Sequence, residues 1–171
     1  KLAQQPVLLA TLLLMLLFWQ GLLGKWTVTL RLHPLVVMSH LLGGFALLSV
    51  LWLLLLRLKP FHIPACTSQE EKLRPWAILG LLFIILQISL GGWTSANYAA
   101  FVCTDFPMCQ GQWWPPMNFS AGFHLSFNAE QNYEGGVLST TARTAIQMSH
   151  RLGALITTSY LACLIYKLFG T

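Results

Sequence analysis

Two histidines in apolar surroundings, His40 and His150, are the first candidates for chemistry in this sequence. A six-residue motif encloses each of them, Met38-Ser39-His40-Leu41-Leu42-Gly43 and Met148-Ser149-His150-Arg151-Leu152-Gly153. Upstream of each motif four further residues recur with one spacing, Gln20, Gly24, Trp26, Thr27 and Gln87, Gly91, Trp93, Thr94. Polar side chains are costly inside apolar helices. Their repetition predicts a duplicated helix pair with one functional histidine in each copy.

His40 and His150 are suited to bind a haem iron. Each is expected five or six residues into its helix, about 8 to 9 Å below the helix end. Neutral imidazole is the usual axial ligand of haem iron, and this depth would leave the haem propionates near the membrane surface. Basic side chains that could bind them there are Arg143, Arg151, Lys25 and Arg31. From the residues alone, the two histidines could share one haem.

Other roles for the same residues stay open. Gly43 and Gly153 lie one turn below the histidines, where a flat macrocycle could lie against the backbone, although small residues also permit close helix packing. A lone histidine could hydrogen-bond a neighbouring helix, and Gln20 and Gln87 could polarise a ligand or join two helices. A copper or zinc site is not favoured, because no second ligand stands three or four residues after either histidine.

Cys103 and Cys109 are the candidates for sulfur chemistry. They bracket five residues in a segment expected to face an oxidising compartment, which favours a disulfide. A reactive dithiol is the alternative, although the spacing differs from Cys-x-x-Cys. Cys66 and Cys163 have no evident partner and are interpreted as free thiols. Asp105, Glu130 and Glu134 could accept a proton, or could be solvated loop acids.

The elements that position these residues are expected to cross a membrane. The 171 residues are 56% apolar and 9% charged, with a mean hydropathy of +0.63. Four stretches are long enough to span a bilayer, residues 6–23, 35–56, 76–96 and 144–166. We therefore predict an all-α polytopic membrane protein, a single bundle over residues 1–171 built from repeat units 6–56 and 76–166.

The charged residues predict the orientation. Short connections on one side carry Lys1, Arg57, Lys59, Lys72, Arg74 and Lys167, which predicts that side, with both chain ends, to be cytoplasmic. Dispersed basic residues argue against a nucleic-acid partner. A large outer loop, residues 94–142, is rich in aromatic residues and is expected to fold as a cap, or else to place its aromatic side chains in the membrane interface. The start at Lys1 suggests a piece of a longer protein.

Several motifs resemble one known family. They are Gly91-Gly92-Trp93-Thr94-Ser95, Cys103-Thr104-Asp105-Phe106-Pro107-Met108-Cys109-Gln110-Gly111, Trp113-Trp114-Pro115-Pro116, Tyr133-Glu134-Gly135-Gly136 and Ala142-Arg143-Thr144-Ala145-Ile146-Gln147-Met148-Ser149-His150-Arg151. Together they resemble the haem A synthase family of cytochrome oxidase assembly proteins. The resemblance covers nearly all of the chain.

The resemblance implies eight transmembrane helices in two similar halves, of which this chain matches helices three to six. Each haem site then takes two histidines from one half, so His40 belongs to the substrate-side pair and His150 to the haem b pair, with both partners outside this chain. This implication replaces the single shared haem. The family also has a glutamate one turn before the histidine of its second helix, and that helix is not among the four matched here. At the same offset from His40 and His150 stand Val37 and Gln147, so the catalytic residues stay unknown.

The implied function is the oxidation of a methyl group of haem O to the formyl group of haem A, by successive hydroxylation, for cytochrome c oxidase biogenesis. This would make the chain a membrane oxidoreductase with haem b as cofactor and a disulfide between Cys103 and Cys109. Expected partners are the haem O synthase, oxidase assembly factors, the lipid membrane and a second copy of the chain. The expected location is the bacterial or the mitochondrial inner membrane. The alternatives are a non-enzymatic b-type cytochrome and an assembly scaffold.

Overall fold

The computed structural model describes residues 7–58, 68–125 and 128–169, and these residues are helical or irregular, with no strand among them. The long helices are α1 (Val7–Thr29), α2 (Pro34–Leu58), α3 (Ser68–Ala96) and α5 (Thr140–Phe169). A 3-10 turn, η1 (Ala99–Val102), and a one-turn helix, α4 (Phe119–Gly122), lie between α3 and α5. The expectations for Lys1, Lys59 and Cys66 fall outside the described residues.

The predicted membrane architecture is confirmed. α1, α2, α5 and residues 71–96 of α3 are each long and apolar enough to cross a bilayer. Large apolar side chains cover their outward faces, as with Leu8 (82% exposed) and Leu155 (65%). Because helices satisfy their backbone hydrogen bonds internally, such surfaces are stable against lipid.

Local backbone chemistry sets two helix ends that differ from the prediction. α1 continues past Leu23 to Thr29 and stops where Arg31 and Leu32 take left-handed conformations, with φ of 49° and 60°. α5 begins at Thr140 rather than at residue 144, because the Ser139 hydroxyl accepts a hydrogen bond from the Ala142 N–H and caps the helix. His150 therefore lies about three turns into α5, whereas His40 lies about two turns into α2. The equal depth expected from the sequence is not found when counted from the helix starts.

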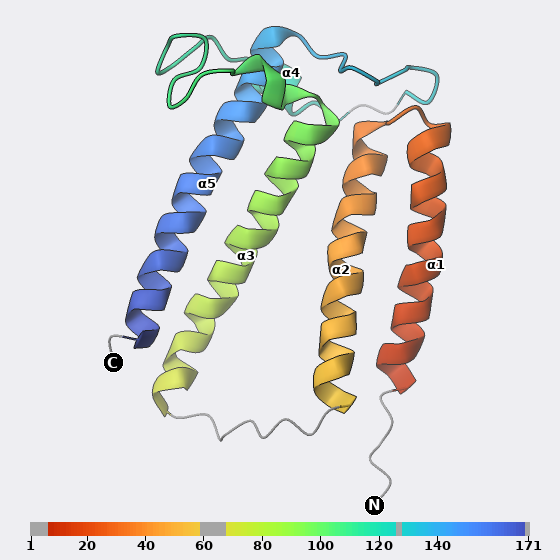
Figure 1. Ribbon diagram of the computed structural model, residues 1–171, viewed down its shortest axis with the longest axis vertical. Coiled ribbons are helices and arrows are strands. Elements are labelled where there is room, and N and C mark those ends of the chain that lie inside the picture. The colour runs from red at the N-terminus through yellow and green to blue at the C-terminus, as the bar shows by residue number, and fades with distance from the viewer. Residues whose placement is uncertain (1–6, 59–67, 126–127, 170–171) are drawn as a thin grey trace, which may run out of the picture.

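The four long helices stand side by side in the order α1, α2, α3, α5 (Figure 1), and each packs against its neighbours in that order. The described parts of the connection between α3 and α5, residues 97–125 and 128–139, lie over one end of the bundle, here called the loop end, where the α1–α2 turn also lies (Figure 1). The opposite end carries the basic residues of three helices, Arg57, Lys72, Arg74 and Lys167. The loop end carries Lys25, Arg31, Arg143 and Arg151, so the described residues include four basic side chains at each end, and the cytoplasmic side stays a prediction.

Residues of the loop join the helices at the loop end. Trp93 packs with Ala99 and Ile146, and its indole N–H donates to the Gly122 carbonyl over 2.9 Å in a buried hydrogen bond. The Tyr133 N–H donates to the Arg31 carbonyl over 3.1 Å, which links the loop to the α1–α2 turn. The loop therefore holds both helix pairs together.

Hydrogen bonds, rather than an aromatic core, order most of this loop. Tyr133 is buried and contacts the ring of His33 edge-on at 4.7 Å. Most other aromatic side chains of the loop are exposed by 38 to 84%, namely Phe101, Phe106, Trp113, Trp114, Phe119 and Phe123. Their exposure favours the interfacial placement of these side chains over a packed aromatic cap.

Candidate functional site

His150 is held by a glutamine from the neighbouring helix. The amide nitrogen of Gln87 on α3 lies 2.9 Å from His150 Nδ1 and donates to the His150 backbone carbonyl over 3.1 Å. One side chain thus contacts both the ring and the backbone of the same residue on α5. This contact fixes the orientation of the imidazole through Nδ1.

His40 has the same partner on its own helix pair. The hydrogen-bonding groups around Gln20 of α1 place its amide nitrogen toward α2, 2.9 Å from His40 Nδ1 and 3.0 Å from the His40 carbonyl. In this orientation the amide oxygen accepts from the Gly44 N–H over 3.3 Å. The interhelical role weighed for the two glutamines is therefore the one the structure contains.

Glycines make room for the two imidazole rings. A Cβ atom on Gly24 of α1 would lie 3.3 Å from Cε1 of His40, and one on Gly91 of α3 would lie 3.1 Å from Cε1 of His150. Such contacts are tighter than most side-chain contacts in proteins. The repeated glycine four residues after each glutamine is thus explained by the histidine that faces it.

A second pair of glycines makes room for the glutamines. A Cβ on Gly43 would collide with the Gln20 amide, and one on Gly153 would lie 2.5 Å from Oε1 of Gln87. The macrocycle surface expected at these glycines is wrong, because glutamine side chains occupy it. The repeated glutamines, histidines and glycines thus form one unit packed across two helices.

The two histidines line separate grooves. His150, which is half-buried, lines a groove of about 440 Å³ with Gly91, Thr94, Ser95, Tyr98, Ala100, Phe101 and Gln147. His40, which is exposed on the surface of this chain, lines one of about 520 Å³ with Gln20, Leu41, Gly44, Phe45, Leu47 and Leu48. Separate grooves agree with two sites and not with a single shared ligand.

The side chains one turn before each histidine differ between the grooves. Gln147 lines the His150 groove, and its Oε1 is buried without a hydrogen-bond partner in the part of the chain that the structure describes. Val37, its counterpart before His40, is apolar and half-buried. Neither position supplies a carboxylate.

Arg151 binds the loop rather than standing free beside His150. Its guanidinium donates to three backbone carbonyls of the loop, those of Met108 (2.8 Å), Asp105 (2.9 Å) and Cys103 (3.2 Å). The ring of Phe106 lies 5.7 Å from the guanidinium carbon. The sequence did not indicate this role, because the carbonyls lie more than 40 residues away along the chain.

Arg143 remains the better placed of the two arginines to bind an anionic group. It is half-buried near the start of α5, and its Nε is buried without a hydrogen-bond partner among the described residues. A propionate contact for Arg143 stays a prediction.

The loop beneath Arg151 is closed by a disulfide between Cys103 and Cys109, whose Cα atoms are 4.7 Å apart and whose side chains are buried. Asp105 braces the same loop, because its carboxylate accepts from the N–H groups of Gly111 (2.9 Å) and Gln110 (2.8 Å). The hydrogen bond from Gly111, followed by that from Gln110, holds the pKa of Asp105 below its ordinary value, against the opposing effect of desolvation.

The remaining candidates lie apart from the grooves. Glu130 and Glu134 are exposed loop residues, and Cys163 is an exposed free thiol on α5. Within the described residues, no group of three or more His, Cys, Asp or Glu side chains is placed to hold a metal ion. A site on this chain would therefore offer one protein ligand at each histidine.

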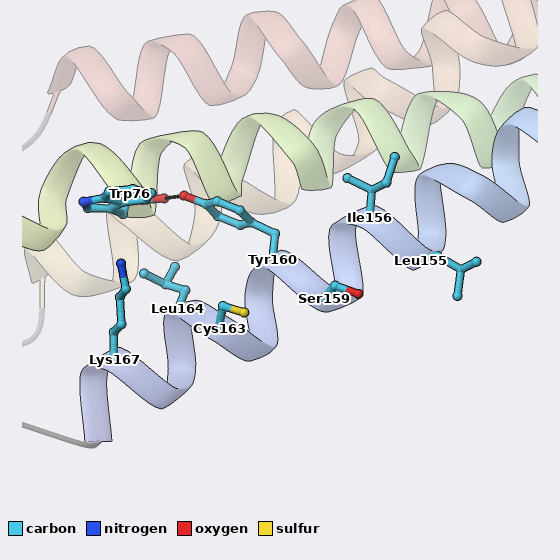
Figure 2. Close-up of a pocket in the computed structure, with 8 residues that line it drawn as sticks. All are labelled: Trp76, Leu155, Ile156, Ser159, Tyr160, Cys163, Leu164 and Lys167. Atoms are coloured by element: carbon cyan, nitrogen blue, oxygen red, sulfur yellow. Dashed lines mark hydrogen bonds between the residues drawn. The ribbon is translucent and has the colours of Figure 1, made fainter.

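A further groove lies at the end of α3 and α5 opposite the loop end. Its volume is about 540 Å³, and Figure 2 shows Trp76 of α3 facing a row of α5 side chains there. The Tyr160 hydroxyl donates to the Trp76 carbonyl over 2.8 Å, and the Lys167 ammonium lies 4.3 Å from the centre of the Trp76 ring. Its lining is mainly apolar and distant from both histidines along the helices, so we assign it no chemistry.

The fold and the two grooves define a polytopic helical membrane protein with a glutamine-held histidine in each helix pair. The chain belongs to the cytochrome oxidase assembly protein family (COX15-CtaA), whose family model matches residues 1–171. The resemblance seen in the sequence is thereby confirmed.

Curated relatives carry the name Heme A synthase. The protein of Shewanella oneidensis is 46% identical over 169 residues, covering 99% of this chain and 51% of the relative. The protein of Caulobacter vibrioides is 28% identical over 141 residues (79% and 37%), and that of Halalkalibacterium halodurans is 24% identical over 126 residues (71% and 42%). The chain thus spans about half the length, or less, of these relatives. No solved structure matches it.

Proposed function

We propose that this chain contributes to a haem A synthase, which oxidises a methyl group of haem O to the formyl group of haem A for cytochrome c oxidase. The observation that carries the proposal is the 46% identity to the Shewanella oneidensis Heme A synthase across 99% of this chain. Two grooves that each present a fixed imidazole support it. Because the chain spans about half of that relative, the remaining ligands would come from outside it.

The side chains in both grooves fit a haem. A glutamine side chain contacts Nδ1 of each histidine, the ring atom from which neighbouring groups commonly orient metal-ligating histidines. In this proposal His150 holds haem b, His40 faces the haem O substrate, and Arg143 binds a propionate. Haem b, when bound, supplies one-electron transfer.

This chain's own residues orient the substrate and limit its access to water. The His40 groove is lined by Leu41, Phe45, Leu47 and Leu48, which suit an apolar macrocycle. The Gln20 amide prevents the His40 ring from turning, so the substrate edge meets one ring orientation. The oxidising equivalents and the other electron carriers come from outside the chain.

The setting follows from the same proposal. The basic end of the bundle lies in the cytoplasm, or in the mitochondrial matrix, and the large loop lies on the opposite side of the inner membrane. A haem O synthase supplies the substrate, oxidase assembly factors receive the product, and a second copy of the chain is a further partner. Nucleic acid has no part in this function.

One observation favours an alternative. Neither Val37 nor Gln147 supplies a carboxylate beside its histidine, and haem-binding histidines without a neighbouring carboxylate could serve in a b-type cytochrome that only transfers electrons. Bound pigment separates the two functions, because the cytochrome would hold haem b alone.

Chromatography of the haems extracted from the purified protein tests the proposal. We expect haem b together with haem O or haem A, depletion of haem b in His150→Ala and depletion of haem O or haem A in His40→Ala. His124→Ala, in the exposed loop, is the matched control and keeps both pigments. Haem b alone in the parent protein, or unchanged pigments in both histidine variants, would overturn the proposal.

A further inference from the structure

The backbone carbonyl of each histidine decides which way the facing amide points. A carbonyl oxygen only accepts hydrogen bonds. The Gln87 atom 3.1 Å from the His150 carbonyl is therefore the amide nitrogen, and the same holds for Gln20 beside the His40 carbonyl at 3.0 Å. The second N–H of each amide then meets Nδ1 of the histidine at 2.9 Å.

This orientation determines where the ring proton lies. Because the amide nitrogen donates, Nδ1 must accept, and a neutral imidazole then carries its proton on Nε2. In that tautomer the Nε2 lone pair is not free for a metal. The amide orientation in the structure is thus matched to a ring that does not ligate a metal through Nε2.

We propose that Gln20 and Gln87 are positioning residues that set the ring tautomer, donating to Nδ1 when Nε2 carries the proton and rotating to accept from Nδ1–H when Nε2 binds iron. The proposal rests on the proposed haem-ligand role of the two histidines. The ring keeps one proton throughout, lost from Nε2 and gained at Nδ1. Among uncharged side chains, an amide can serve both states by exchanging its two ends, because it carries a donor and an acceptor on one planar group.

The two sites differ in the free-energy cost of rotating the glutamine amide so that its oxygen faces Nδ1. Turning Gln20 breaks the hydrogen bond from the Gly44 N–H at 3.3 Å. The Oε1 of Gln87 is buried without a partner in the described chain, so turning Gln87 breaks no such bond. After rotation, the glutamine Oε1 would face the histidine backbone carbonyl at both sites, so this repulsion is common to both. His150 therefore converts to its ligand form more readily than His40, by about 2- to 10-fold for one hydrogen bond. This suits a resident cofactor at His150 and an exchangeable substrate at His40.

Nitrogen-15 NMR of the histidine rings tests the proposal on the haem-free protein, because the two tautomers give different ring-nitrogen shifts. We expect the Nε2–H tautomer for His40 and His150 in the unaltered protein. Gln87→Glu replaces the donor with an accepting oxygen and moves the His150 proton to Nδ1, while His40 is unchanged. Gln112→Met, at an exposed loop glutamine, leaves both rings as they are. The Nδ1–H tautomer in the unaltered protein would overturn the proposal without any variant.

A second readout uses the protein with haem bound. In Gln87→Glu the electron paramagnetic resonance signal and the reduction potential of the haem at His150 shift, because a carboxylate at Nδ1 makes the ring a stronger donor. Unchanged spectra in that variant would contradict the positioning role. If His150→Ala keeps its haem while the tautomers are as expected, the proposed function fails and the hydrogen-bond assignment stands.

Discussion

Removing the guanidinium of Arg151 should open the disulfide loop. Arg151 donates to the carbonyls of Cys103, Asp105 and Met108, all within a loop that the disulfide closes. Arg151→Met keeps a side chain of similar length and removes every donor. Arg151→Lys keeps the charge on an ammonium, which lacks the planar fork of a guanidinium.

The contacts set the size of the effect. A hydrogen bond from a charged donor contributes about 1.5 to 3 kcal/mol. Water reaches a loop at the bundle end, so the three bonds to Arg151 together are expected to stabilise the closed loop by about 2 to 3 kcal/mol rather than by their sum. At about 1.4 kcal/mol for each tenfold change, Arg151→Met should open the loop about 30 to 150 times more often. Arg151→Lys should fall between it and the parent.

The rate at which dithiothreitol reduces the disulfide measures this opening. Cys103 and Cys109 are only 6% and 0% exposed, so reduction requires the loop to open. Mass spectrometry of alkylated thiols follows the reaction in detergent, with Arg74→Lys, exposed at the opposite end of the bundle, as control. Reduction of Arg151→Met at the parent rate would refute the reasoning, because the hydrogen bonds would then contribute nothing to closure.

Three further predictions follow from single contacts. The hydrogen bond from Gly111, as the first cause, holds the pKa of Asp105 below its ordinary value, so the carboxylate stabilises the loop at neutral pH and loses this effect as pH falls through the lowered pKa. With a phosphine reductant, which acts in acid, the parent should be reduced more slowly than Asp105→Asn at neutral pH, and the ratio of the two rates should approach one in acid; a ratio that does not change with pH would contradict the role of the carboxylate. Gly43→Ala should lower the free energy of unfolding by about 1 to 3 kcal/mol, because its new methyl group overpacks against the Gln20 side chain. Gly44→Ala is the control, because a Cβ at Gly44 meets nothing within 4 Å and should leave stability unchanged. Equal melting temperatures for the two variants would contradict the packing of Gly43 against Gln20. Trp93→Phe should cost about 1 to 3 kcal/mol, because a buried carbonyl loses its donor; calorimetric unfolding measures it, and an unchanged midpoint would count against the contact.

The four membrane-spanning helices could be predicted from the sequence, because only a few properties determine whether a segment spans a membrane. Length and apolar composition decide them, since each spanning segment must satisfy its own backbone. The helix ends required more than hydropathy. The left-handed residues Arg31 and Leu32 stop α1, and the Ser139 cap starts α5 ahead of the apolar run. These are local backbone features that a hydropathy pattern does not contain.

The site was predictable in its residues and not in its contacts. The repeat identified the two histidines and the two glutamines, but it could not show that Gly43 and Gly153 make room for amides rather than for a macrocycle. That distinction depends on how two helices face each other. The part played by Arg151 was missed, because carbonyls from a distant loop leave no pattern around it.

The most direct test of the proposed function measures haem A formed in membranes supplied with haem O. The parent protein and His124→Ala should convert haem O to haem A, while His40→Ala and His150→Ala should leave haem O unconverted and lose the pigment of their own site. Formation of haem A by both histidine variants at the parent level, or none by the parent protein when haem O is bound, would contradict the assignment of the two histidines to a haem A synthase.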